Sequence, residues 1–322
     1  MRILVVRTDK LGDFITALPA LYLLKHHDPN NQIIALVAPL NRELAMACEF
    51  IDEVIIDDGK SSVMELAKKI KKAHVDASVT LFSNTRVALA QFLACIPKRI
   101  APATKIAQIF YTDRITQRRS EVKMAEFEYN IELAKALFNE LKVEYPKPLL
   151  SFKDAAALYA KFCQEYNVQR EVVAFHVGFG GSSDANWSLD EYVVLIQEVL
   201  ACEKFTVVLT FGPDEQELCE TMRSKLQDKN VIFYISKSGI LNFAKLISNF
   251  KLFVSTSTGT YHLASLVGCP TMTFFADSLF ASSKRWKGVG DEALQQHFMI
   301  PHESQRRDAL FREVRGVLAH VG

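Results

Sequence analysis

Residues 251–275, KLFVSTSTGTYHLASLVGCPTMTFF, decide the fold class. Lys251 to Ser255 is short, apolar and β-branched, which is typical of a buried strand. Helical spacing of apolar residues follows from near Gly259 and ends at Gly268, a common helix terminator. A second apolar strand is expected at 271–275. The stretch therefore predicts one β-α-β unit of a parallel sheet.

The loop between this strand and its helix is rich in hydroxyl groups. Ser257 and Thr258 are both suited to capping the first backbone amides of a helix that begins near Gly259. Such a helix end combines free amides, the positive end of the helix dipole and hydroxyl groups, which suit a phosphate or a sugar better than a metal ion. We therefore predict a ligand site here, and the alternative is an ordinary capped helix in a parallel sheet.

The composition indicates a globular protein of two domains. The 322 residues, 23% charged and 49% apolar, suffice for two cores of ordinary size. A formal net charge of +1 argues against a general nucleic-acid-binding protein. The six cysteines show no CxxC spacing, which favours a reducing cytoplasm and no zinc site. The N-terminus lacks the pattern of a signal peptide and no apolar run reaches ~20 residues, so any membrane contact is expected to be peripheral.

The first half of the chain alternates strands and helices. Apolar strands are expected at 2–6, 33–37, 53–56 and 77–81, with amphipathic helices between them. This alternation predicts an α/β fold with a parallel, doubly wound sheet that binds ligands at the carboxyl ends of its strands.

Asp13 follows the first strand, at such a ligand-binding edge. A carboxylate that faces a cleft at this place is suited to act as a general base. The alternative is a helix cap, which is the usual role of an aspartate after a glycine. Pro19 falls within the helical pattern that follows, so we expect a kink or a late start of that helix.

The segment 98–123 is basic, with only Asp113 and Glu121 as acidic residues. With Phe110 and Tyr111 interleaved, it is suited to an anionic acceptor such as a phosphorylated or carboxylated glycan, or to the head groups of a membrane. The alternative is a solvated charged face. Its basic residues are Lys98, Arg99, Lys105, Arg114, Arg118, Arg119 and Lys123.

The sequence also predicts the domain boundaries. A helix at about 124–141 is expected to close the first domain, and 144–148 is predicted to be a linker because two prolines stiffen it. The expected domains are 1–147 and 148–303. A terminal helix at 304–322 carries an apolar stripe, and we expect it to pack back on the first domain.

The second half repeats the pattern. A strand at 172–176 leads into a loop of glycines and serines, whose amides are suited to a diphosphate. The next strand, 205–211, is followed by Glu215, which is placed to accept the hydroxyls of a ribose, although acidity at a helix start is the alternative. The candidate phosphate-binding residues of the loop are Gly178, Gly180, Gly181, Ser182 and Ser183.

Four segments of the chain resemble glycosyltransferase family 9, the heptosyltransferases of lipopolysaccharide inner-core synthesis. They are Arg7-Thr8 with Gly12-Asp13, the loop from His176 to Trp187, Phe211-Gly212-Pro213 with Glu215, and Ser-Thr-Gly-x-x-His-Leu-Ala at 257–264. The likeness covers both halves in the same order. It implies a GT-B architecture, with two Rossmann-like domains facing a central cleft. It also implies ADP-heptose as donor and an inverting, metal-independent transfer to a Kdo or heptose hydroxyl.

The resemblance implies roles for the two domains. Domain 1–147 is expected to bind the acceptor through Thr8, Gly12 and the basic segment 98–123, with Asp13 as the catalytic base. Domain 148–303 is expected to bind the nucleotide sugar, with His262 joining the residues named above. An ADP-sugar is the expected substrate, and no cofactor or metal is expected. The expected partners are an anionic glycolipid acceptor and the inner face of the cytoplasmic membrane, without nucleic acid, in a cytoplasmic protein.

Two positions depart from the family pattern. Ala185 stands where the family commonly has a lysine that meets the donor phosphate, and Ser257 stands where it often has an aspartate that contacts the donor sugar. Backbone amides near 180–183 and the helix from Gly259 are then expected to carry more of the diphosphate charge, aided by Lys284 or Arg285. A nucleotide-sugar epimerase of the same architecture and a non-catalytic nucleotide-sugar-binding protein are the alternatives.

Overall fold

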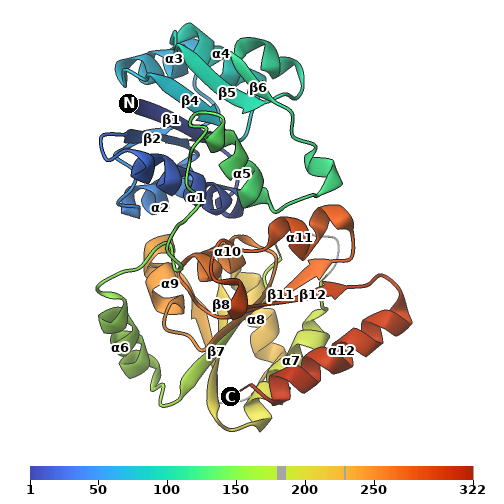
Figure 1. Ribbon diagram of the computed structural model, residues 1–322. Helices are drawn as coiled ribbons and strands as arrows, with labels where there is room; N and C mark the ends of the chain where they lie inside the picture. Colours follow the sequence, from blue (N-terminus) through green and yellow to red (C-terminus); the bar gives the residue numbers. More distant parts are fainter. Residues whose placement is uncertain (180–185, 228–229, 322) are drawn as a thin grey trace. The chain divides into compact units, whose positions relative to one another are not determined.

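The computed structural model describes residues 1–179, 186–227 and 230–321. The chain divides into two compact units, Met1–Pro146 and Lys147–Gly322. Each unit has its own parallel sheet with flanking helices (Figure 1). The division falls within the segment 144–148 that the two prolines marked as a linker.

The first unit is built on a six-stranded sheet in the order β3-β2-β1-β4-β5-β6, in which every neighbouring pair is parallel. β1 is central, and its register places Val5 opposite Ala35 of β2 and Val79 of β4. Helices cover both faces of the sheet, which explains the unbroken apolar run of β1. The strands are β1 (Arg2–Arg7), β2 (Gln32–Val37), β3 (Glu53–Ile56), β4 (Ala77–Thr80), β5 (Lys98–Pro102) and β6 (Asp113–Ile115).

The helices of the first unit divide between the two faces of its sheet. Apolar residues of α3 and α4 share one core with Leu4 and Val6 of β1, while α1 and α5 pack against each other on the other face (Figure 1). The α-helices are α1 (Leu11–His27), α2 (Arg42–Ala47), α3 (Val63–Lys72), α4 (Thr85–Leu93) and α5 (Glu126–Lys135), and the 3-10 turns are η1 (Pro39–Asn41), η2 (Ile106–Phe110) and η3 (Arg119–Glu121).

Three expectations for the first unit need correction. α1 begins at Leu11 and contains Pro19, so of the two alternatives expected at this proline the late start is wrong, and the kink stays a prediction. The closing helix α5 is shorter than the predicted 124–141. β5 and β6 lie inside the basic segment, where the sequence pattern predicted no strand. β6 is the edge strand of the sheet and tolerates charged residues, whereas β5 pairs with β4 and β6 and carries its charged residues, Lys98 and Arg99, at its start.

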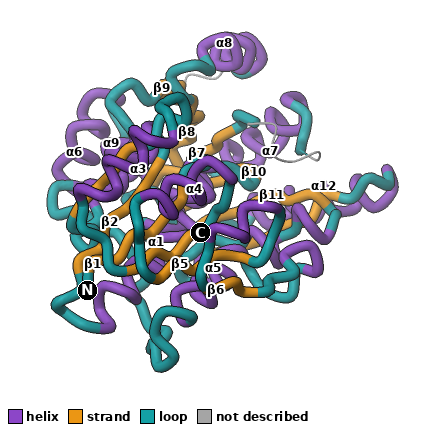
Figure 2. Tube along the Cα trace, turned by 90° about the horizontal axis from the view of Figure 1, so that it is seen from above, coloured by secondary structure: helices purple, strands orange, loops and turns teal. Residues whose placement is uncertain are grey.

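The second unit repeats the architecture with the order β12-β11-β10-β7-β8-β9, again with parallel neighbours throughout. The stretch 251–275 forms β10, α10 and β11 as predicted, and Figure 2 shows the strands β10 and β11 in orange. The strands are β7 (Glu171–His176), β8 (Phe205–Phe211), β9 (Val231–Ile235), β10 (Leu252–Thr256), β11 (Thr271–Ala276) and β12 (Gln295–Ile300).

The main core of the second unit lies between its sheet and the helices α7, α8 and α12. Trp187 packs there with its ring centroid 5.7 Å from that of Phe274 and 5.1 Å from that of Phe311, as expected of a core residue. The helices are α6 (Ala155–Tyr166), α7 (Leu189–Ala201), α8 (Gln216–Lys225), α9 (Ile240–Ile247), α10 (Gly259–Leu266), α11 (Ser283–Trp286) and α12 (Ser304–Ala319), with 3-10 turns η4 (Leu279–Ala281) and η5 (Glu292–Leu294).

The terminal helix α12 corrects another expectation. Val314 and Leu318 are fully buried in the core of the second unit, with Leu310 packed against the same cluster. Arg315 also pairs with Glu198 of α7. The apolar stripe that we expected to pack on the first domain is therefore used within the second unit.

The helices described in the structure include none that is long and apolar enough to cross a membrane.

Candidate functional site

Asp13 lies in the first turn of α1, just beyond the carboxyl end of β1. Its Oδ1 atom accepts a 2.6 Å bond from Nη2 of Arg7, the last residue of β1. Lys10 holds the cap position of α1, so the helix-cap alternative for Asp13 does not apply. The Asp13 side chain is 21% exposed. Its carboxylate is therefore accessible while Arg7 fixes its orientation.

Arg7 is the centre of a cluster of carboxylates. Its side chain is 3% exposed and also contacts Asp9 Oδ1 at 2.8 Å and Glu126 Oε1 at 3.3 Å. Glu126 is bound by Arg119 as well. Burial raises the pKa of Asp9 from 3.8 to about 6; the positive charge of Arg7 opposes this rise and the negative charge of Asp13 adds to it. In this cluster three carboxylates share two guanidinium groups.

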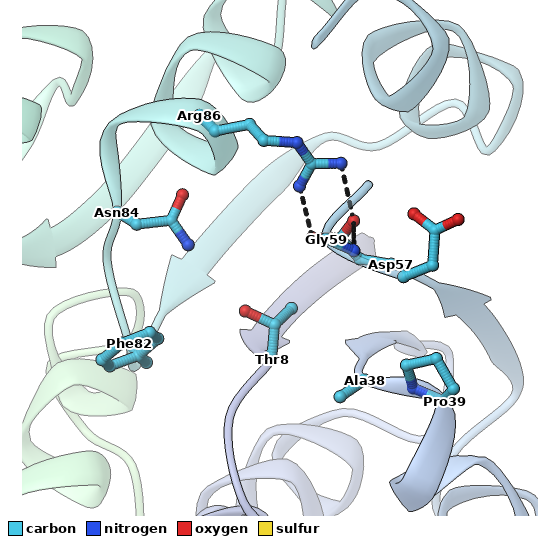
Figure 3. A pocket seen from close by; sticks show the side chains of 9 residues that line it. Thr8, Ala38, Pro39, Asp57, Gly59, Phe82, Asn84 and Arg86 are labelled. Carbon is cyan, nitrogen blue, oxygen red and sulfur yellow. Dashed lines mark hydrogen bonds and ion pairs between the residues drawn. The ribbon is translucent and has the colours of Figure 1, made fainter. Parts of the chain in front are cut away.

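A pocket of about 290 Å³ opens at the carboxyl ends of β1, β3 and β4 in the first unit (Figure 3). Asp57 and Arg86 form a bidentate pair at its edge, with both oxygen–nitrogen distances 2.8 Å. Asp57 is buried and also accepts a bond from the Gly59 amide. The polar and aromatic side chains that line the pocket are those of Thr8, Asp57, Asp58, Phe82, Asn84 and Arg86. Thr8 thus lines this pocket, and Gly12 lies beside Asp13 in the first turn of α1; their contacts with an acceptor stay predictions.

The basic segment 98–123 is less available to a ligand than its composition predicts. The guanidinium group of Arg99 donates to the backbone carbonyls of Phe110 and Ile96. Arg119 is bound to Gln117 and Glu126, so both arginines have structural partners. Arg118 and Lys123 both pair with Glu121 on the surface. Lys105 and Arg114 are exposed, and Lys98 is half-buried.

Two residues that hold Arg7 beside Asp13 were not predicted from the sequence. Glu126 and Asn130 of α5 contact Arg7 only through the packing of α5 on α1, which no local pattern records. Asp57 could have been predicted from the sequence, because it directly follows the expected strand 53–56. The rule that ligands bind beyond strand ends, applied to every strand, would have found it.

In the second unit, Glu215 fills the space beside two glycines at the ends of β7 and β8. Its Oε2 atom accepts a 2.6 Å bond from the Gly212 amide. A Cβ atom on Gly178 would lie 2.1 Å from Glu215 Oε1, so only glycine fits there while Glu215 keeps this position. The structure therefore brings Gly178 and Glu215 together, and their contact with a donor stays a prediction.

His176 adds a second acceptor beside Glu215. Its Nδ1 atom lies 2.9 Å from the carbonyl oxygen of Thr210 and therefore carries the proton, which leaves Nε2 as an acceptor 4.0 Å from Glu215. Burial lowers the pKa of His176 in spite of the nearby carboxylate, so the ring is neutral at pH 7. Two acceptors side by side suit a ligand that brings hydroxyl donors, such as a ribose.

The N-terminus of α10 forms the other part of this region. Ser257, Thr258 and Gly259 are each partly exposed, so the helix end is accessible. Thr258 holds the cap position without a side-chain bond to a backbone amide of the helix, and its hydroxyl lies 2.8 Å from that of Thr260. The expected side-chain cap is therefore wrong, and the first amides of α10 have no side-chain cap from Thr258.

The side chain of His262, in α10, is too deeply buried to be freely accessible to a ligand. It is 3% exposed, burial lowers its pKa to about 4, and its Nδ1 atom has no hydrogen-bond partner among the described residues. Its ring packs near Tyr261 and Trp286. Arg285 is also buried, with its guanidinium carbon 3.7 Å from the Phe280 ring centroid. Donor contacts by His262, Lys284 and Arg285 stay predictions.

Four of the expected phosphate-binding residues lie outside the described residues. They are Gly180, Gly181, Ser182 and Ser183, and Ala185 lies there too. The chain after this segment is anchored, because Arg307 donates to the Asn186 carbonyl and to Glu191.

Two parallel six-stranded sheets with helices on their faces, each with polar groups at strand ends, define the chain as a GT-B protein. The family model for glycosyltransferase family 9 (heptosyltransferase) matches residues 63–308, and the chain belongs to this family. It is therefore a glycosyltransferase.

Known proteins resemble the chain over almost its whole length. A "Putative glycosyltransferase" of Haemophilus influenzae is 37% identical over 300 residues, 90% of this chain and 86% of that protein. "Lipooligosaccharide heptosyltransferase 2" of Campylobacter jejuni is 23% identical over 296 residues, 89% and 85% of the two chains. The solved structure of E. coli ADP-heptose lps heptosyltransferase II superposes with a TM-score of 0.79 at 18% identity, covering 99% of this chain and 98% of that one.

Proposed function

We propose that this protein transfers a heptose from ADP-heptose to a hydroxyl of a lipopolysaccharide or lipooligosaccharide core acceptor, with inversion and without a metal ion. The observation that carries the proposal is the accessible Asp13 carboxylate, oriented by Arg7 at a strand end in a chain of glycosyltransferase family 9. The named activities of the C. jejuni relative and of the E. coli structure support the choice of heptose and of a lipooligosaccharide acceptor.

Asp13 acts as the general base in this mechanism. It takes the proton of the acceptor hydroxyl as that oxygen attacks the anomeric carbon, and the bond from this carbon to the diphosphate breaks. ADP leaves with the bonding electron pair, so attack from the opposite side inverts the anomeric centre. Since Oδ1 is bound to Arg7, Oδ2 is the oxygen that receives the proton. General base catalysis contributes roughly 10²–10⁴-fold in such steps.

The second unit binds the donor. Glu215 and the neutral His176 accept the hydroxyls of the adenosine ribose, and the first amides of α10 donate to the diphosphate with the help of the helix dipole. The hydroxyl groups of Ser257 and Thr258 are further donor contacts at this helix end. Stabilisation of the leaving group by amides and a helix end makes a metal ion unnecessary in this proposal.

The acceptor is an anionic glycolipid, and the protein reaches it at a membrane surface. The exposed apolar side chains of α4 and η2 support this contact: Phe92 is 49% exposed, Ile106 70% and Ile109 59%. Exposed Lys105 and Arg114 lie in the same basic segment, which suits the head groups of anionic lipids. We place the protein at the inner face of the cytoplasmic membrane.

The test measures ADP release from ADP-heptose with and without a core oligosaccharide acceptor. The wild type is expected to release ADP only with acceptor, and Asp13→Asn is expected to lower turnover by roughly 10²–10⁴-fold while ADP-heptose affinity, measured by calorimetry, stays nearly unchanged. Near-normal turnover of Asp13→Asn would remove Asp13 from its role. Release of altered sugar without acceptor would instead identify an epimerase, and donor binding without turnover a binding protein.

A further inference from the structure

The one basic side chain among the described residues that line the pocket of the first unit already has its charge neutralised by a neighbouring carboxylate. Among the residues that line it, Arg86 is the cation. Its guanidinium group gives bonds to both oxygens of Asp57 and to the carbonyl and hydroxyl oxygens of Ser61. An anionic ligand would therefore have to compete with a carboxylate and a carbonyl that already hold Arg86.

Asp58 gives the residues that line the pocket a net negative charge. Bonds from the backbone amides of Ser61 and Lys60 lower the pKa of Asp58 to about 2, so it is ionised at neutral pH. Asp57 and Arg86 cancel each other, and Asp58 remains. The charges of the lining residues thus favour a neutral or cationic ligand over an anionic one.

The other lining groups suit a sugar ring. Asn84 accepts a 2.9 Å bond from the Val87 amide through Oδ1, which leaves its NH₂ group for a ligand. Figure 3 shows Thr8 between Phe82 and Gly59, with the Asn84 amide directed toward the same space. The Phe82 ring is 40% exposed and offers an apolar face to the C–H groups of a sugar. With about 290 Å³, near the lower end of small-molecule pockets, the space suits a single sugar residue.

Phe82 also connects this pocket to Asp13. The guanidinium carbon of Arg7 lies 6.0 Å from the centroid of the Phe82 ring, and the same guanidinium group binds Asp13 at 2.6 Å. A sugar that packs on Phe82 therefore lies next to the residue that orients the carboxylate base.

We propose that this pocket binds the acceptor sugar that receives the transferred group, that this sugar is uncharged and rich in hydroxyl groups, and that Asp58 excludes sugars carrying a carboxylate or phosphate. This inference rests on the proposed function, and it narrows the acceptor. Anionic groups of the glycolipid lie outside the pocket. Asp58 is a specificity-determining residue and takes no part in the chemical step.

The test compares two probes by ligand-observed NMR titration: a methyl heptoside, which is neutral, and the methyl glycoside of Kdo, which carries one carboxylate. Two like charges about 6 Å apart, at an effective dielectric constant of about 40, change affinity by about tenfold. The wild type is expected to prefer the heptoside. Asp58→Asn is expected to reduce this preference about tenfold, and Asp58→Lys about 100-fold, so that the Kdo glycoside becomes the preferred ligand.

The matched control is Asp28→Asn. Asp28 is an exposed aspartate that accepts a 2.9 Å bond from a nearby backbone amide, like Asp58, but it lies outside the pocket. Both asparagine variants keep an acceptor oxygen for their turns, so folding is preserved. Equal binding of both probes to the wild type, no binding of either, or the same preference in the Asp58 variants as in Asp28→Asn would overturn the proposal. Charge-dependent binding without transfer from ADP-heptose would overturn the proposed function instead.

Discussion

Asp9→Asn is expected to stabilise the protein at neutral pH. The pKa of Asp9 is about 6 in the folded chain, against 3.8 for a solvated aspartate, because burial disfavours its charge. Between these values the folded chain binds a proton that the unfolded chain has lost. The free energy of unfolding therefore falls as the pH rises from about 4 to about 6, by about 3 kcal/mol at 1.36 kcal/mol for each pKa unit. Asparagine keeps the acceptor oxygen for Arg7 and removes the charge.

Urea denaturation at a series of pH values between 4 and 8 measures this effect. At pH 8 Asp9→Asn is expected to exceed the wild type by up to about 3 kcal/mol, and at pH 4 the two are expected to be similar. The control Asp28→Asn removes an exposed carboxylate and is expected to keep the wild-type slope between pH 4 and 6. If Asp9→Asn also kept that slope, the buried ionised carboxylate that we infer beside Arg7 would not exist.

Three further outcomes are expected. Gly178→Ala should weaken ADP binding in calorimetry by at least about tenfold, since its Cβ would displace the carboxylate of Glu215. The control Gly316→Ala, with open space around its Cβ, should leave ADP binding unchanged. Equal affinities of the two variants for ADP would refute the proposed donor geometry. Ile109→Glu should reduce co-flotation with phosphatidylglycerol vesicles about tenfold. Met64 of α3 is also exposed, at 55%, and the control Met64→Glu should leave co-flotation unchanged. Equal losses in the two variants would exclude a membrane contact specific to η2. Leu318→Ala should lower the free energy of unfolding by about 2–5 kcal/mol, and a change near zero would contradict the packing of α12 in the second unit.

The sequence predicted those features that local patterns determine. β10, α10 and β11 were found because apolar periodicity, a glycine stop and β-branched strands all agree there. The positions of Asp13 and Glu215 near strand ends were predicted because polar residues beyond a strand end collect at one edge of a parallel sheet, while their roles stay predictions. Family motifs then supplied the chemistry that the pattern alone left open.

Features that depend on contacts distant in sequence were missed. Arg119 was expected to meet an acceptor, but it binds Glu126 across a turn that the sequence does not reveal. β5 and β6 were not predicted because both are short and carry charged residues, and only β6 is at the edge of the sheet. The stripe of α12 indicated a buried face correctly, yet periodicity identifies only the face and not the surface that covers it.

The cluster around Arg7 also makes the choice of base testable. A general base works best with a pKa near the working pH, and the raised pKa of Asp9 would suit that role as well. Asp9 and Asp13 are similarly exposed, 17% and 21%, and bind the same guanidinium group, so neither access nor orientation separates them. What separates them is position, since Asp13 lies in the first turn of α1 and belongs to the Gly12-Asp13 pair of the family motif.

Turnover of the two asparagine variants decides between these carboxylates. With Asp13 as base, Asp9→Asn should keep turnover within about tenfold of the wild type, since it leaves the Arg7–Asp13 pair in place, while Asp13→Asn loses roughly 10²–10⁴-fold. The reverse order would assign the proton transfer to Asp9. In that case Asp13 would serve to raise the pKa of Asp9 through its negative charge, and turnover of the wild type would fall as the pH drops below about 6.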